Sequence, residues 1–149
     1  MNRFVIDASV ALKWVVAESG SVDALALRWA DQLIAPDLLV AECANALWKM
    51  ARRTEITAED AVFAARTLER SNIELYPMRR LLGPATRLAT TLDHPAYDCI
   101  YLALAQTEAC ALVTADERLL RKLAASPNLD LDLPRVLTLG KAAQLVAPG

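Results

Sequence analysis

Two acidic residues stand just beyond short apolar runs of the sequence. Asp7 follows FVI at residues 4–6, and Asp116 comes after ALVT at residues 111–114. Apolar runs of this length predict buried strands, and the carboxyl ends of parallel strands meet at one edge of a sheet, where ligands usually bind. We therefore expect both carboxylates at one site.

Two further acids interrupt apolar stretches. Glu42 lies within LLVAECA at residues 38–44, and Asp98 lies within YDCIYL at residues 97–102. A buried carboxylate costs several kcal/mol unless it is paired, hydrogen-bonded or bound to a cation. Too few Lys and Arg residues adjoin these acids to neutralise them all, and ligands that are all oxygen suit Mg²⁺ or Mn²⁺ better than zinc. The sequence therefore predicts a metal centre whose ligands and catalytic residues are Asp7, Glu42, Asp98 and Asp116.

Each acid also has a purely structural interpretation, which the sequence leaves open. Asp7 and Asp116 stand where an N-cap would precede a helix. Asp98 falls in the first turn of an expected helix, where the helix dipole favours a negative charge. Glu42 has Lys49 further along the same helix as a possible ion-pair partner. The metal centre is favoured by the set of four rather than by any single member.

Three neighbouring polar residues are candidates for a supporting role. Ser9 and Thr114 place hydroxyl groups two residues from the strand-end acids, where they can bond a carboxylate or a metal-bound water. Asn45 follows Glu42 by three residues, on the same helical face. The alternatives are ordinary turn hydroxyls and a solvated helix face.

The elements that position these residues alternate along the chain. Short apolar strands separated by helices, without long linkers, predict an α/β fold with a mostly parallel sheet covered on both faces. Strands are expected at residues 4–6, 33–35, 73–76, 111–114 and 136–138. Helices are expected at residues 9–17, 22–32, 36–53, 57–70, 80–91, 95–109 and 116–125, and from about residue 140.

Composition limits the remaining possibilities. The 149 residues, 55% hydrophobic and 23% charged, predict one domain spanning residues 1–149. A net charge of −2 and a pI of about 5.4 do not indicate a general nucleic-acid binder, so such a function would depend on local basic patches. No apolar run is long enough to cross a membrane, and the run before Asp7 is too short for a secretory signal, so we expect a cytoplasmic protein.

Histidine and cysteine usage excludes some chemistry. The single histidine, His94, argues against a histidine-rich zinc site or a Ser-His-Asp triad and is expected in a loop. Cys43, Cys99 and Cys110 show no C-x-x-C spacing and are predicted to be buried free thiols.

Four segments together resemble a known family. They are FVIDASVA at residues 4–11, APDLLVAECANAL at 35–47, PAYDCIYLALA at 95–105 and LVTADERLL at 112–120. In this order and spacing they resemble PIN-domain ribonucleases, specifically VapC-type toxins of toxin–antitoxin pairs. The resemblance implies a PIN-like three-layer fold with a five-stranded, mostly parallel sheet. It also implies an endoribonuclease that hydrolyses phosphodiester bonds with Mg²⁺ or Mn²⁺, leaving 5′-phosphate and 3′-hydroxyl ends.

The resemblance further suggests how the acids are used and where RNA is held. Asp7 and Asp98 are the expected direct ligands, with Glu42 and Asp116 completing the set directly or through water. Two basic clusters follow two of the acids and are candidates for contacting RNA phosphates, the alternative being solvated helix faces. They comprise Lys49, Arg52, Arg53, Arg118, Arg121 and Lys122.

Partners are implied in the same way. Proteins of this kind commonly form homodimers and are inhibited by an antitoxin protein. The apolar stripes near residues 24–29 and 61–68 are candidate surfaces for these partners, and core packing is the alternative. Two other functions stay open: a PIN nuclease that processes RNA without being a toxin, and a non-catalytic metal-binding interaction module.

Overall fold

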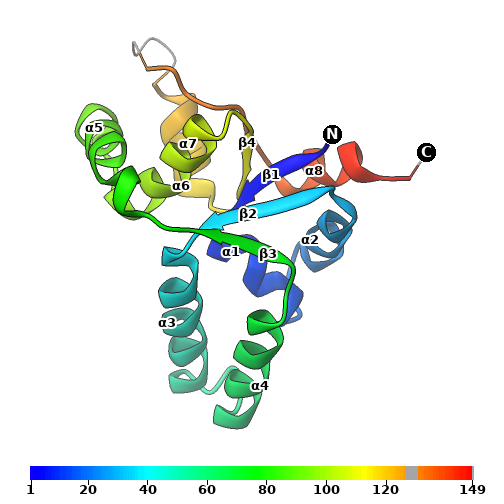
Figure 1. Cartoon of the computed structure of the whole chain (residues 1–149). Coiled ribbons are helices and arrows are strands. Elements are labelled where there is room, and N and C mark those ends of the chain that lie inside the picture. Colours follow the sequence, from blue (N-terminus) through cyan, green and yellow to red (C-terminus); the bar gives the residue numbers. More distant parts are fainter. Residues whose placement is uncertain (127–130, 149) are drawn as a thin grey trace.

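A single parallel sheet forms the centre of the computed structural model, which describes residues 1–126 and 131–148 (Figure 1). Its strand order is β3-β2-β1-β4-β5, and all four neighbouring pairs are parallel. The strands are β1 (Arg3–Ile6), β2 (Gln32–Pro36), β3 (Ile73–Tyr76), β4 (Ala111–Val113) and β5 (Val136–Leu137). The five expected strands are therefore all present.

Helices cover both faces of this sheet, which gives the three-layer α/β fold that was expected (Figure 1). Helices α5, α6 and α7 lie on one face, and α1 to α4 with α8 lie on the other. The helices are α1 (Ala8–Ala11), α2 (Ser21–Ala26), α3 (Leu38–Arg52), α4 (Ala58–Glu69), α5 (Leu82–Leu92), α6 (Ala96–Thr107), α7 (Glu117–Ala124) and α8 (Leu139–Val146), with short 3-10 helices at Leu12–Trp14, Leu27–Trp29 and Arg79–Leu81.

The first two expected helices are shorter than their apolar spacing suggested. Instead of one helix over residues 9–17, α1 lasts a single turn and tightens into a 3-10 turn that ends at Trp14. The expected helix over 22–32 was wrong at its end, because Ala30 is extended and Gln32 belongs to β2. Gln32 is held there by its backbone N–H bond to Asn2 and by the guanidinium of Arg3.

Two other boundaries differ from the prediction by one or two residues. Pro36 ends β2 rather than opening α3, which begins at Leu38. Thr138 does not extend β5, because its hydroxyl accepts a hydrogen bond from the Lys141 N–H and caps α8. Pairing with Tyr76 thus keeps Pro36 in β2, and the Thr138 cap decides where the chain turns from β5 to α8.

The core lies on both faces of the two central strands. Val5, Ile6 and Leu112 are fully inaccessible to solvent, and Leu102 of α6 packs into the same core. Strands buried on both faces read as continuous apolar runs, which is why β1 and β4 were recognisable from the sequence. The prediction of free thiols is also confirmed, although Cys110 is only partly buried. No helix within the described residues has the length and apolar character needed to cross a bilayer.

A capping box starts α4 and provides a test of the local structure. The Thr57 hydroxyl accepts a hydrogen bond from the Asp60 N–H at 3.0 Å, and the Asp60 carboxylate accepts one from the Thr57 N–H at 3.2 Å. Thr57→Ala is expected to lower the free energy of unfolding by about 1 kcal/mol, measured by chemical denaturation. Thr57→Ser should retain most of this stability. Equal losses in the two variants would contradict a role for the hydroxyl.

Candidate active site

The carboxyl ends of β1 and β4 meet at one polar cluster. Asp7 is 6% exposed and Thr114 is fully buried. The Thr114 hydroxyl donates to one oxygen of Asp7, and the Ser9 hydroxyl donates to the other at 2.5 Å. Ser9 in turn accepts a hydrogen bond from the Ala115 N–H at 3.0 Å. The two hydroxyl groups singled out in the sequence thus join the two strand ends through Asp7.

Burial controls the charge of Asp7. Loss of water around the carboxylate raises its pKa from 3.8 to about 6, and the negative charge of Asp98 adds to the rise. The hydroxyl groups of Ser9 and Thr114 and the Val10 N–H favour the ionised form and offset part of the effect. The interaction between Asp7 and Asp98 indicates that these acids share one electrostatic environment.

Asp116 caps α7 and also lies next to the Asp7 cluster. Its Oδ1 accepts hydrogen bonds from the Arg118 N–H at 2.9 Å and the Leu119 N–H at 3.4 Å, which caps α7. Its own backbone N–H donates to the Thr114 hydroxyl. The N-cap interpretation is therefore correct, and the same residue adjoins the Asp7 cluster.

Glu42 approaches from α3 on the other side of the site. Its Oε1 accepts a hydrogen bond of 2.6 Å from the hydroxyl of Tyr101 on α6. The alternative ion pair with Lys49 does not form among the described residues. Burial raises the pKa of Glu42, and the charges of Asp98 and Asp116 raise it further, while Tyr101 opposes the rise.

Asp98 lies in the first turn of α6, as expected. Its Oδ2 is 2.6 Å from Nε2 of His94, in the loop before the helix. The loop position of His94 was predicted, but its contact with Asp98 was not, and the role of Tyr101 was missed. Helical spacing gave a signal for Tyr101 alone, since it lies three residues after Asp98 and so falls near the same side of α6.

The donor chemistry of the site fits a hard divalent cation. Four carboxylates influence one another, and none forms an ion pair with Lys or Arg within the described part of the chain. Glu42, Asp98 and Asp116 each keep one carboxylate oxygen without a hydrogen-bond partner there. Oxygen ligands of this kind suit Mg²⁺ or Mn²⁺.

The side chains do not, however, form a closed ligand cage. As the side chains lie in this structure, no group of three or more Asp, Glu, His or Cys residues among those described is close enough together to hold a metal ion. An open site that leaves several positions for water is typical of Mg²⁺. Burial raises the pKa of the nearby Cys43 thiol to about 12.

The basic clusters lie on exposed helix surfaces. Arg52 and Arg53 end α3, about 15 Å along its axis from Glu42. The guanidinium of Arg52 stacks over the ring of Trp48 at 5.4 Å. On α7, Arg118 is exposed and Arg121 lies 3.9 Å from Glu117. Of the two remaining members, Lys49 is exposed and Lys122 is half-buried. The supporting candidate Asn45 is also exposed.

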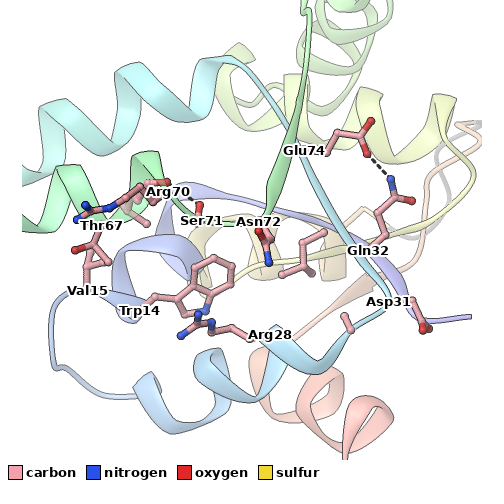
Figure 2. Close-up of a pocket in the computed structure, with 13 residues that line it drawn as sticks. Trp14, Val15, Arg28, Asp31, Gln32, Thr67, Arg70, Ser71, Asn72 and Glu74 are labelled. Atoms are coloured by element: carbon pink, nitrogen blue, oxygen red, sulfur yellow. Dashed lines mark hydrogen bonds between the residues drawn. The ribbon is translucent and has the colours of Figure 1, made fainter.

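A separate pocket of about 460 Å³ opens at the opposite edge of the sheet (Figure 2). Trp14 forms part of its wall, and Gln32 and Glu74 lie at the amino ends of β2 and β3. Arg28 and Arg70 reach it from different parts of the chain (Figure 2). None of the four acids lines this pocket, so it is distinct from the carboxylate cluster.

Similar proteins share this arrangement of elements. The solved structure of PAE2754 from Pyrobaculum aerophilum matches with a TM-score of 0.71 and 21% identity, over 97% of this chain and 95% of that one. VapBC2 from Rickettsia felis, solved bound to a DNA fragment from their promoter, matches with a TM-score of 0.61 and 12% identity, over 91% and 98%. At these identities the likeness supports the fold.

Proteins that are similar in sequence identify the family more narrowly than the fold does. VapC ribonuclease Mb0985 from Mycobacterium bovis is 36% identical over 115 residues, which cover 77% of this chain and 87% of that protein. Ribonuclease VapC3 from Pyrobaculum aerophilum is 32% identical over 126 residues, covering 83% and 96%. The PIN domain family matches residues 4–125, a span that contains all four acids. This chain therefore belongs to the PIN-domain family and, within it, to the VapC ribonucleases.

Proposed function

We propose that this protein is a metal-dependent endoribonuclease and the toxin component of a toxin–antitoxin pair. The observation that carries the proposal is the electrostatic coupling of four carboxylates, at the end of β1, on α3, on α6 and at the β4–α7 junction, without a neutralising Lys or Arg in the described residues. The ribonuclease names of the relatives support the same activity.

Asp7 and Asp98 would hold Mg²⁺ or Mn²⁺ directly, with Glu42 and Asp116 completing the set directly or through water. Such an ion lowers the pKa of a bound water, neutralises the scissile phosphate and stabilises the leaving oxygen. Ser9 and Thr114 orient Asp7 by donating to its two oxygens. Asn45 is exposed near Glu42 and supplies an amide donor for a phosphate oxygen.

The basic residues of α3 and α7 would hold the RNA on either side of this site. A negative metal-dependent centre between positive surfaces fits a polyanionic substrate in a chain whose net charge is only −2. The six side chains of the two clusters are Lys49, Arg52, Arg53, Arg118, Arg121 and Lys122. An RNA substrate also agrees with action in the cytoplasm.

An antitoxin protein is the proposed partner, as the likeness to a VapBC2 structure suggests. An apolar groove of about 220 Å³ between α3 and α4, with Val40, Cys43 and Leu47 in its wall, provides a surface for this partner. The two apolar stripes near 24–29 and 61–68 divide between core and surface. Their buried members are Ala24, Leu27 and Ala64, and their exposed ones are Leu25, Trp29, Val62 and Phe63. These exposed side chains are the proposed homodimer surface.

We also propose that residues 1–149 act as one PIN domain. Although the family match ends at residue 125, β5 pairs with β4, and α8 packs against α2. Leu137 and Ala142 belong to the common core.

The activity can be tested with purified protein freed of bound antitoxin. Discrete cleavage products from a mixed cellular RNA pool are expected with Mg²⁺ or Mn²⁺ and not with a chelator. Asp116→Asn should lose most cleavage yet remain folded, because Asn is also a good N-cap. Asp31→Asn, at the opposite edge of the sheet (Figure 2), is the matched control and should cleave normally. Metal-independent products that persist in Asp116→Asn would contradict the proposal.

A further inference from the structure

Tyr101 is a polar exception in the most buried part of α6. It is 1% exposed, and the four residues that follow it, Leu102 to Ala105, are apolar and buried. A phenylalanine would fill the same space without the cost of removing a hydroxyl from water. The hydroxyl therefore needs a partner, and the one it has among the described residues is Oε1 of Glu42, at 2.6 Å.

This contact joins the two helices that carry acids. Asp98 and Tyr101 are three residues apart on α6, whereas Glu42 lies 59 residues away from Tyr101, on α3. A glutamate side chain has three rotatable bonds and loses conformational entropy whenever it is held in one position. A hydrogen bond from a buried, rigid phenol holds the carboxylate before any ligand binds.

We infer that Tyr101 is a positioning residue for Glu42: its hydroxyl fixes Oε1 and leaves Oε2 available to the divalent cation. This inference rests on the proposed function, in which Glu42 belongs to the metal site. Tyr101 itself contacts neither metal nor RNA. Its effect is expected on cation binding and on turnover, and not on the binding of RNA.

The test compares Tyr101→Phe with Tyr97→Phe. Tyr97 lies on the same helix but is 63% exposed, so this control removes a hydroxyl of the same kind from the surface. Mn²⁺ binding is measured directly by calorimetric titration, and RNA cleavage is measured separately as kcat and KM. Tyr101→Phe should weaken Mn²⁺ binding or lower kcat by about 10- to 100-fold with KM unchanged, and Tyr97→Phe should match the wild type.

A double-mutant cycle separates positioning from a general effect on packing. If Tyr101 acts through Glu42, Tyr101→Phe should have little further effect in a Glu42→Gln background. Full loss from Tyr101→Phe in that background would overturn the inference, as would wild-type Mn²⁺ binding and kcat in the single variant. A wild-type protein that binds Mn²⁺ but cleaves no RNA would overturn the proposed function, while the Mn²⁺ titrations would still decide the role of Tyr101. Absence of Mn²⁺ binding by the wild type would overturn both.

Discussion

Replacement of Asp7 by Asn is expected to abolish RNA cleavage and to remove a large pH dependence of folding. The loss of cleavage should reach at least about 100-fold, because a metal centre supplies several kcal/mol of transition-state stabilisation. Asn keeps the size of the side chain and can still accept the Val10 N–H that caps α1. The protein should therefore fold normally while the proposed site fails.

The stability effect follows from the raised pKa of Asp7. Burial moves this pKa from 3.8 to about 6, so the folded protein binds a proton more tightly than the unfolded chain does. Metal-free wild type should accordingly lose stability as the pH rises from about 4 through 6, by roughly 2 to 3 kcal/mol in total. Asn cannot ionise, so this contribution should be absent from the variant.

The measurement is the free energy of unfolding in chelator at pH 4, 6 and 8. Asp37→Asn is a suitable control, because Asp37 also precedes a helix but is exposed and makes no side-chain cap. The control should follow the wild-type pH dependence, and Asp7→Asn should gain stability relative to both as the pH rises. Parallel curves for all three proteins would show that Asp7 is not a strained, buried carboxylate.

The sequence was most informative where a local pattern of residues determines the structure. Strands β1 and β4 read as apolar runs because both of their faces are covered, and the acids that end them were placed at one edge by parallel-sheet geometry alone. The structure brings Asp7 and Thr114 into contact there. The helix expected over residues 57–70 likewise begins where it was predicted, because the Thr57 cap depends on Asp60, only three residues away.

Contacts between distant segments were not predictable in the same way. The structural alternative for Glu42 was an ion pair with Lys49 on its own helix, yet the hydrogen-bond partner of Glu42 is Tyr101 on α6. Nothing in a single sequence states that α3 and α6 lie together at these residues. The loop position of His94 was predicted correctly. Its contact with Asp98 was missed, because this contact depends on how the loop before α6 turns. Tertiary packing thus determines which side chains become partners. The apolar periodicity of a sequence predicts helices and strands, but not how they pack together.

Bound Mn²⁺ should raise the melting temperature of the wild type and have much less effect on Asp98→Asn. A cation that binds only the folded protein stabilises it by about 2.7 kcal/mol at 100 times its dissociation constant. For a chain of this size that corresponds to a rise of roughly 5 to 10 °C. Asp98 is the critical position because its negative charge raises the pKa of both Asp7 and Glu42. Removal of this charge should therefore weaken cation binding more than a change at the edge of the cluster.

Thermal unfolding with and without millimolar Mn²⁺ tests this expectation, and excess chelator should reverse the shift. Asp98→Asn keeps a hydrogen-bonding group for His94 and removes one charge, so a reduced shift reports on the cation rather than on damage to α6. Asp37→Asn should retain the full wild-type rise, because its exposed side chain lies outside the carboxylate cluster. If Mn²⁺ leaves the wild type and Asp98→Asn equally unmoved, the four carboxylates do not share a metal ion, and their meeting at the sheet edge needs another explanation.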